Sequence, residues 1–339
     1  MGVVSRRNFV GALMLTGTIA SGSAVAEDRI ALPAIDVYTR LGSGIVGAST
    51  SVITSEEIMR SPGQSIQDII AREPGVQTWS VFGAVNGAGT TIDLRGFGAS
   101  AASNTLVLLN GRRLTDIDLA GVDFSAISRE SIERIEITRG NSGTVLYGDG
   151  AVGGVVNIVT KTGENLPPSL RIGGGFGTFN QREGNFSANA SAGGFSAAMF
   201  GNAFDSDGFR KNNALQQRSV AGDFRYNVGG GTFYLNVTAD DQKLGLPGAR
   251  KVTLTTSELV TDPTGATTPT AFANKQGVSA TLGYSRTLIN GIEMIVDGGV
   301  RQKEQQTFSE ISGFQITDKR KLTTFSFTPR KNSGGVMLW

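Results

Sequence analysis

Residues 131–161 read SIERIEITRGNSGTVLYGDGAVGGVVNIVTK, and this stretch decides the fold of the first half of the chain. It opens with isoleucines spaced among charged residues and closes with the β-branched run Val155 to Thr160. β-Branched residues favour strands, so both ends predict short strands. The glycines between them include Gly148, Gly150, Gly153 and Gly154. Glycine permits tight turns and close backbone approach, so we expect the strands to pack in a crowded space.

The wider region from residue 45 to 163, which includes this stretch, has the pattern of one compact α+β domain with short helices and short strands. Thr54 to Glu57 form a capping box, which predicts a helix start. Pro62 is expected at the first position of a second helix. Leu106 to Leu109 predict a buried strand that is closed by the turn Asn110-Gly111.

From residue 169 to 328 the pattern changes to alternation of apolar and polar residues. Residues 185 to 192, 233 to 240 and 278 to 285 all alternate in this way. Long alternating strands, with short turns at one end and longer loops at the other, predict an antiparallel transmembrane β-barrel. The alternative is a soluble β-sandwich, whose second face would be less polar.

The first 26 residues have the pattern of an export signal. Arg6 and Arg7 precede an apolar run from Phe9 to Ala20, and Ala24-Val25-Ala26 fits a cleavage site. The run is too short for a transmembrane helix, which takes about 20 residues. The paired arginines also fit a twin-arginine signal, so Sec and twin-arginine export both stay open.

Composition excludes several classes of chemistry. The chain has no histidine and no cysteine, which rules out disulfides, thiolate nucleophiles, Cys/His zinc sites and a histidine base. Basic and acidic residues nearly balance, at 31 and 29, so charge gives no support to nucleic-acid binding. Residues 148 to 153 satisfy G-x-G-x-x-G, but a strand follows them where a dinucleotide site needs a helix. We expect no enzyme activity, no cofactor and no metal site.

Several stretches resemble the plug domain of TonB-dependent outer-membrane receptors. Residues 131–161 resemble the family pattern I-E-R-I-E-V-x-R-G … L-Y-G-x-x-A-x-G-G-V-I-N-I-x-T-K. Ile92 to Gly98 resembles the I-R-G-F segment, and Val107 to Leu114 resembles the L-V-L-v-D-G segment. Arg72 to Val76 resembles the early P-G-V segment. The resemblance covers about residues 45 to 163.

The resemblance implies a plug inside a barrel of about 22 strands. Only about eight strands are predicted between residues 169 and 328, and a barrel of eight strands has no room for a plug. An open sheet would leave edges that lipid does not tolerate. The expected fold is an α+β plug domain followed by an incomplete barrel, from a truncated or partial receptor. The tail is expected to be irregular, because Pro329 and nearby glycines break the alternation, although Trp339 is aromatic like the last residue of many barrels.

The expected domain organisation follows from these patterns. It comprises a signal peptide (1–26), a periplasmic segment (27–44), the plug (45–163), a partial barrel (169–328) and the tail (329–339). The periplasmic segment holds the expected TonB box, which would pair with TonB by strand addition; a plain linker is the alternative. The box residues are Ile35, Asp36, Val37, Tyr38 and Thr39.

The resemblance also implies two sets of site residues. A charged network between plug and barrel is expected at Arg95, Glu133, Arg134, Glu136 and Arg139. Ligand-facing residues are expected in two plug loops, at Trp79, Phe82, Asn86, Ser100 and Asn104. The side chain of Trp79 could equally pack against the barrel wall.

The implied function is TonB-dependent uptake of a scarce ligand, such as a ferric siderophore or a cobalamin-like compound, across the cell outer membrane. The expected partners are TonB in the periplasm, the small ligand and outer-membrane lipid, with no nucleic acid. Without histidine or cysteine, iron would be held mainly by its chelator. The alternative is a truncated, non-transporting fragment, with a soluble plug and unassembled strands.

Overall fold

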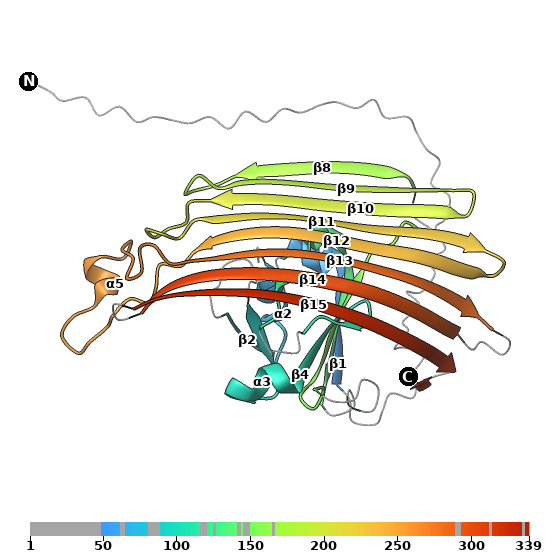
Figure 1. Cartoon of the computed structure of the whole chain (residues 1–339), viewed down its shortest axis with the longest axis horizontal. Helices are drawn as coiled ribbons and strands as arrows, with labels where there is room; N and C mark the ends of the chain where they lie inside the picture. Colours follow the sequence, from blue (N-terminus) through green and yellow to red (C-terminus); the bar gives the residue numbers. More distant parts are fainter. Residues whose placement is uncertain are drawn as a thin grey trace, which may run out of the picture.

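Residues 49–160 form an N-terminal domain, and residues 169–338 form a long curved sheet beside it (Figure 1). The computed structural model describes residues 49–61, 65–80, 89–115, 121–124, 127–140, 144, 150–164, 167–288, 293–311, 314–333 and 336–338. The predicted signal peptide and TonB box lie outside these described residues.

Two short helices open the N-terminal domain, each with a capping box. Thr54 and Glu57 cap α1 (Ser55–Arg60), as the sequence predicts, with the Thr54 amide 2.7 Å from the Glu57 carboxylate. In α2 (Ile66–Ile70) the same motif is made by Ser65 and Asp68. The second helix therefore begins after Ser65, and the prediction that it begins at Pro62 is wrong. The physical reason is that the Ser65 hydroxyl accepts a hydrogen bond from the Asp68 amide and so caps the helix at that point. Pro62 itself lies outside the described residues.

A mixed sheet forms the centre of the N-terminal domain. Its order is β1 (Ser49–Thr54), β6 (Ile132–Arg139), β7 (Gly154–Thr160), β4 (Thr105–Leu109) and β5 (Arg112–Arg113). β4 and β7 are parallel, and the other neighbours are antiparallel. Outside this sheet, β2 (Gln77–Ser80) pairs with β3 (Thr90–Asp93), and two 3-10 turns, η1 (Gly98–Ser100) and η3 (Arg129–Ser131), precede α3 (Ala101–Asn104) and β6 respectively. The strands predicted at both ends of residues 131–161 are confirmed.

Isoleucines fill the core between this sheet and the helices. The fully buried ones are Ile58, Ile70, Ile132, Ile135, Ile137 and Ile158. The closest backbone approach is at Gly154, which has a φ of +144°. A Cβ atom there would lie 2.3 Å from the carbonyl oxygen of Thr138, so only glycine fits.

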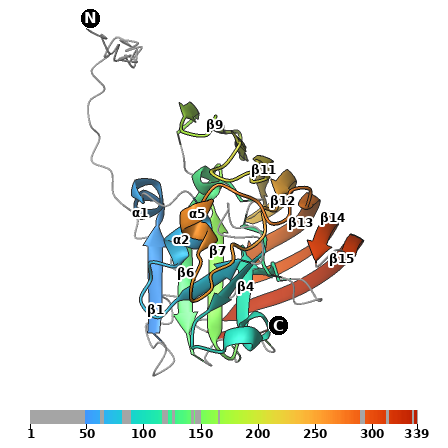
Figure 2. The same ribbon diagram turned by 90° about the vertical axis from the view of Figure 1, so that its left-hand side faces the viewer.

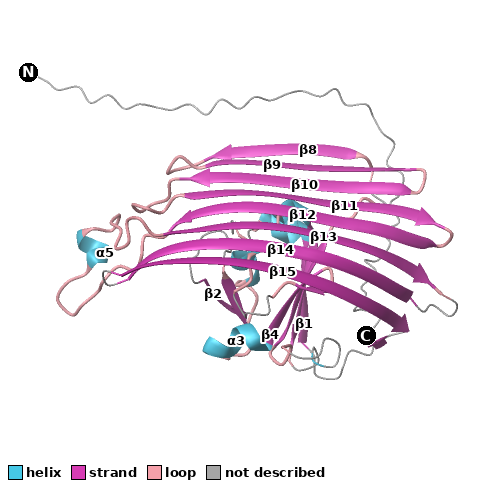
Figure 3. Ribbon diagram, in the orientation of Figure 1, coloured by secondary structure: helices cyan, strands magenta, loops and turns pink. Residues whose placement is uncertain are grey.

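Long antiparallel strands, each paired with its neighbour in the chain, form the C-terminal sheet. They are β8 (Ser169–Phe176), β9 (Arg182–Ala192), β10 (Phe195–Ser206), β11 (Leu215–Val228), β12 (Gly231–Gly245), β13 (Phe272–Thr287), β14 (Glu293–Ile311), β15 (Phe314–Ser333) and β16 (Val336–Leu338). Tight turns join β9 to β10 and β11 to β12 at one end (Figure 3). Longer loops join β8 to β9, β10 to β11 and β12 to β13 at the other end, and the last of these carries α5 (Glu258–Thr261). The predicted series of antiparallel barrel strands is confirmed.

The C-terminal sheet curves around one side of the N-terminal domain (Figure 2). Along β12, Phe233 and Leu235 are exposed on the outer face, whereas Tyr234 and Asn236 lie on the inner face. Other exposed apolar side chains on these strands are Leu170, Ile172, Val278, Leu282, Phe325 and Phe327. β8 and β16 are the edge strands of the described sheet, which is therefore part of a barrel and not a closed one. No helix in the described ranges is long and apolar enough to cross a membrane.

The structure differs from the sequence pattern at the end of β15. This strand continues through Pro329 to Ser333, whereas the sequence predicts an irregular tail from residue 329. Pro329 pairs with Val296 of β14, while β16 pairs only with Lys331–Ser333. Proline is tolerated in strands at a sheet edge, which explains why the pairing continues past it.

Two loops at the long-loop end are fastened to one another. Asn212, in the loop between β10 and β11, has a φ of 53°, and its side-chain amide donates to three carbonyl oxygens of the loop between β12 and β13. Arg210 donates to two more. The acceptors are Leu246, Thr268 and Ala271 for Asn212, and Gly265 and Pro247 for Arg210.

Candidate functional site

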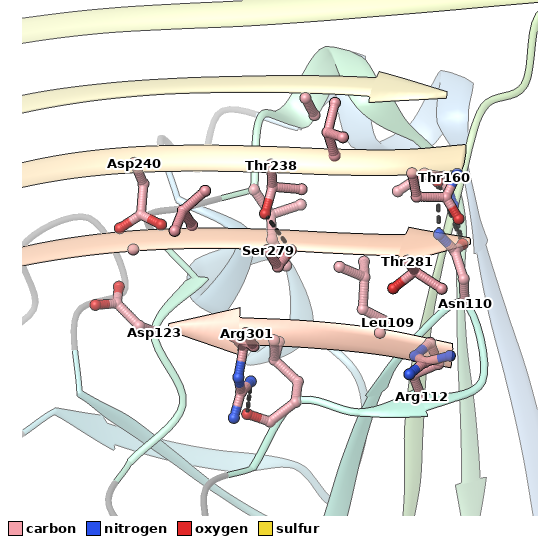
Figure 4. Close-up of a pocket in the computed structure, with 18 of the residues that line it drawn as sticks. Leu109, Asn110, Arg112, Asp123, Thr160, Thr238, Asp240, Ser279, Thr281 and Arg301 are labelled. Atoms are coloured by element: carbon pink, nitrogen blue, oxygen red, sulfur yellow. Dashed lines mark hydrogen bonds between the residues drawn. The ribbon is translucent and has the colours of Figure 1, made fainter. Parts of the chain in front are cut away.

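A cavity of about 700 Å³ lies between the N-terminal domain and the inner face of the C-terminal sheet (Figure 4). The N-terminal domain contributes leucines and polar groups, and the sheet contributes hydroxyl and charged groups; those labelled in Figure 4 are Leu109, Asn110, Arg112, Asp123, Thr160, Thr238, Asp240, Ser279, Thr281 and Arg301. Thr238 and Ser279 are hydrogen bonded to each other across β12 and β13 at 2.7 Å. An apolar lining with a few polar groups is typical of a place where small molecules bind or pass.

At one end of the cavity, Arg112 of β5 forms an ion pair with Asp297 of β14. Asp297 is buried, and its second carboxylate oxygen accepts a hydrogen bond of 2.8 Å from the Tyr234 hydroxyl of β12. Asn110 and Gly111 hold β5 in place, because both have positive φ and form the tight turn that the sequence predicts. The turn thus positions Arg112 against the sheet.

At the other end, Lys275 of β13 forms an ion pair of 3.0 Å with Asp123 of the N-terminal domain. Lys275 is only 3% exposed, so this pair is shielded from solvent. Between the two ends, Arg301 of β14 donates a hydrogen bond of 2.8 Å to the carbonyl oxygen of Leu114. Charged and polar contacts therefore fasten the N-terminal domain to the sheet along the whole cavity.

The segment that connects the two parts is also bonded to the sheet. Glu164 accepts hydrogen bonds of 3.0 Å from Arg225 and from Asn227, both on β11. Gly163 lies so close to β10 that a Cβ atom would be 2.5 Å from the carbonyl oxygen of Ala197. Burial, helped by repulsion from Arg171, lowers the pKa of the nearby Lys161, although Glu130 and Glu133 oppose the shift.

Comparison with known proteins places this arrangement in a family. Residues 46–155 match the family model of the TonB-dependent Receptor Plug Domain. The chain is 29% identical over 315 residues to the vitamin B12 transporter BtuB of Photobacterium profundum, an alignment that covers 86% of this chain. The chain belongs to the TonB-dependent receptors. The N-terminal domain is the plug, and the C-terminal sheet is part of the barrel wall.

Other similar proteins agree with this membership. The ferrienterobactin receptor of Escherichia coli is 36% identical over 140 residues, which cover 38% of this chain and 18% of that receptor. Among solved structures, the unliganded ferric citrate transporter FecA shares the fold with a TM-score of 0.70 at 20% identity, over 84% of this chain and 44% of that one. The ferric yersiniabactin receptor FyuA of Yersinia pestis also has a TM-score of 0.70, at 15% identity, over 84% of this chain and 45% of that one.

The receptor chain spans less than half the length of the first of these relatives, 46% of BtuB. The barrel wall described here is correspondingly partial. TonB-dependent receptors lie in the outer membrane, so the expected location is confirmed. The exposed apolar face of the barrel strands is therefore the face toward lipid.

Of the residues predicted for the charged network, Glu133, Arg134 and Glu136 come together, and their described contacts lie within the plug. Arg134 bonds to Glu136 at 2.7 Å and to Glu133 at 3.2 Å. Arg139 lies 3.6 Å from Glu73 of the same domain, and Arg95 is exposed. Their role as plug–barrel contacts stays a prediction.

The residues predicted to face the ligand are only partly described. Trp79 is exposed on β2, and Ser100 is exposed in η1. β2, and α3 that follows η1, lie on the side of the plug toward the long-loop end (Figure 1). Asn104 is half-buried, and its amide donates to the Ser100 carbonyl oxygen at 2.8 Å. Phe82 and Asn86 lie outside the described residues, as do the TonB-box residues 35–39.

The charged residues that contact the barrel wall were not singled out by sequence reasoning. Arg112 and Asp123 belong to the plug, and Lys275 and Asp297 belong to the wall. A signal for the wall residues exists, because both are charged residues at inward positions of alternating strands. Which plug residue each one meets is decided by the tertiary packing and has no local signal.

Hydrogen bonds to the Asp93 carboxylate shape the plug loop that carries Arg95. The Asp93 carboxylate accepts hydrogen bonds of 2.8–3.0 Å from the backbone amides of residues 95, 96, 97 and 98. Burial raises the pKa of Asp93, but the four amide donors outweigh burial and hold the pKa below its usual range. The charged carboxylate therefore organises the loop.

Asp93→Ala is expected to speed hydrogen exchange of the amides of residues 95–98 by roughly tenfold to a hundredfold, because each loses a charged acceptor. In the wild type this protection should be complete above the unfolded-state pKa of about 3.9. It should disappear as the pH falls through the lower folded-state pKa. Exchange measured on the receptor in outer membranes checks this, with the amides of α1 as the internal reference. Equal exchange in the variant and the wild type would show that the carboxylate does not hold the loop.

Proposed function

We propose that this protein is a TonB-dependent receptor that carries a scarce ligand inward across the outer membrane. The observation that carries the proposal is the cavity between plug and barrel wall, bounded by ion pairs at Arg112–Asp297 and Asp123–Lys275. Buried ion pairs make an interface specific without adding much net stability. Such an interface suits a plug that must close the barrel and still loosen when energy is supplied.

The ligand class is proposed to be a ferric siderophore or a cobalamin-like compound. In support, similar proteins include a vitamin B12 transporter and receptors for ferric chelates. A chain without histidine or cysteine suits a ligand that brings its own metal-holding groups. In the described part of the chain no group of three or more acidic side chains is placed to hold a bare ion.

The surfaces for the two partners are proposed at opposite ends of the barrel. Short turns face the periplasm and longer loops face outward in outer-membrane barrels. The exposed Trp79 and Ser100, with Asn104, are proposed to contribute to ligand binding at the outer end, together with Phe82 and Asn86. Residues 35–39 are proposed to pair with TonB at the periplasmic end. The matched relatives are transporters and receptors, which suggests a protein without enzyme activity and does not favour the alternative of a non-transporting fragment.

Uptake measurements test this function. Cells that depend on this receptor are expected to accumulate one member of a panel of radiolabelled ferric siderophores and cyanocobalamin. Accumulation should fall to the background level in a strain without TonB, because the plug then receives no energy. A matched strain in which residues 35–39 are replaced by a Gly-Ser linker of equal length should behave in the same way. Accumulation that is independent of TonB, or absent for every ligand while the receptor is present in the membrane, would contradict the proposal.

A further inference from the structure

One row of side chains crosses the inner face of the barrel wall near the periplasmic end. Arg225, Tyr234, Gly283 and Asp297 are direct neighbours on β11, β12, β13 and β14. A Cβ atom at Gly283 would lie 2.2 Å from the Tyr234 ring. The missing side chain at position 283 therefore lets the Tyr234 ring lie across β13 and reach Asp297. We call Arg225, Tyr234 and Asp297 the anchor row.

The anchor row contacts two separate segments, the plug strand β5 and the segment that connects the plug to β8. At one end, Asp297 holds Arg112 of the plug strand β5. At the other end, Arg225 holds Glu164 of the connecting segment at 3.0 Å, and its guanidinium carbon lies 5.8 Å from the centre of the Tyr234 ring. A continuous series of polar and cation–π contacts thus runs from the connecting segment to the plug hairpin.

The plug hairpin is the part of the plug that this series can control. β5 has only two residues, it is the edge strand of the plug sheet, and two residue pairs join it to β4. Residues 109–114 of the same hairpin line the cavity. Within the plug, hydrogen bonds to Asn157 and Thr160 of β7 fix the turn of the hairpin. Because only two residue pairs join β5 itself to β4, the contact of Arg112 with the barrel wall is the main further restraint on β5.

Burial makes the contact sensitive to charge. Asp297 is 2% exposed, and the Arg112 side chain is 17% exposed. Removing one member of such a pair leaves a buried charge without its main counter-ion, whereas exchanging the two members keeps the pair. Tyr234 contributes one neutral hydrogen bond, so its removal should matter less.

We propose that the anchor row is a latch that keeps the β4–β5 hairpin against the barrel wall, and that its release opens the cavity toward the periplasm. The proposal rests on the proposed transport function. Arg112 and Asp297 are positioning residues in this device, and Tyr234 fixes the carboxylate that Arg112 meets.

Labelling of a single thiol tests the latch. The chain has no cysteine, so Thr281→Cys places a unique thiol in the cavity. In isolated outer membranes, a polar maleimide should label this thiol at least about tenfold faster when Asp297→Asn is added, the change that 1.4 kcal/mol produces. Adding Arg112→Asp together with Asp297→Arg should return the rate close to that of Thr281→Cys alone, which a merely structural role of either residue would not explain.

A matched control removes a carboxylate of the same kind elsewhere on the wall. Asp318→Asn breaks an exposed ion pair with Arg320 on β15 and should leave the labelling rate unchanged. Assembly is judged by heat-modifiable gel mobility. If the Asp297→Asn variant fails to assemble, Tyr234→Phe replaces it in the test, and labelling is then expected to be about threefold faster than for Thr281→Cys alone. A rate that stays within about twofold of the Thr281→Cys receptor in every assembled variant overturns the latch. If the transport proposal alone is wrong, labelling of the thiol will still depend on Asp297, but cells with the wild-type receptor will take up no ligand.

Discussion

Gly154→Ala is expected to destabilise the plug by about 3 kcal/mol, the sum of backbone strain and overpacking. Gly154 has a φ of +144°, a backbone angle that residues with a Cβ atom rarely adopt. The new methyl group would lie 2.3 Å from the Thr138 carbonyl oxygen. The methyl group would also meet Leu94 of the core at 2.6 Å. Either β6 and β7 separate or the end of β7 shifts, and both disturb the centre of the plug sheet.

The measurement is the urea concentration at which the plug becomes susceptible to protease in isolated outer membranes. Gly184→Ala is the matched control, because a Cβ atom at Gly184 in β9 would meet no atom within 4 Å. The control variant should resist urea like the wild type. Equal urea resistance of the Gly154 and Gly184 variants would mean that the close approach at β7 is not what requires glycine.

Asp123→Ala is expected to weaken the attachment of the plug to the barrel wall by about 3 kcal/mol, because it leaves the charge of Lys275 buried without its main counter-ion. Lys275 is 3% exposed, so water replaces the lost carboxylate poorly. Asp240 lies near the same pair and limits the loss to the lower part of the usual range. Substituting both partners, with Asp123→Leu and Lys275→Met, should cost less because neither charge of the pair stays buried without the other.

The same urea and protease assay measures this effect, since a loosely held plug unfolds within the barrel more readily. Glu56→Ala is the control within the plug, because Glu56 and Arg60 form an exposed ion pair on α1 that should contribute less than about 1 kcal/mol. If the double substitution proves as harmful as Asp123→Ala alone, the cost comes from lost packing and not from an uncompensated charge.

The secondary structure was predictable wherever a local pattern determines it. The capping box of Thr54 and Glu57 indicates the start of α1, and Asn110-Gly111 indicates the turn between β4 and β5. Alternation identifies the barrel strands for the same reason, because each strand separates a polar inner face from an apolar outer face. The second helix was misplaced because Pro62 is a strong local signal, whereas the effective cap at Ser65 depends on Asp68.

The contacts between plug and wall were not predictable in the same way. Arg134 and Glu136 stand out in the sequence as charges on a strand, yet in the described structure they bond to each other. Arg112 and Asp297 are separated by 185 positions, and nothing near either residue indicates the other. Only the way the sheet curves around the plug brings them together.

The fastening of the two long loops by Asn212 and Arg210 has a consequence for how strongly the proposed ligand would be bound there. A flexible loop loses conformational freedom when it closes on a guest, and that loss reduces affinity. Here the loop that carries α5 is already held by hydrogen bonds from the neighbouring hairpin. A guest that docks on it therefore meets a preorganised surface.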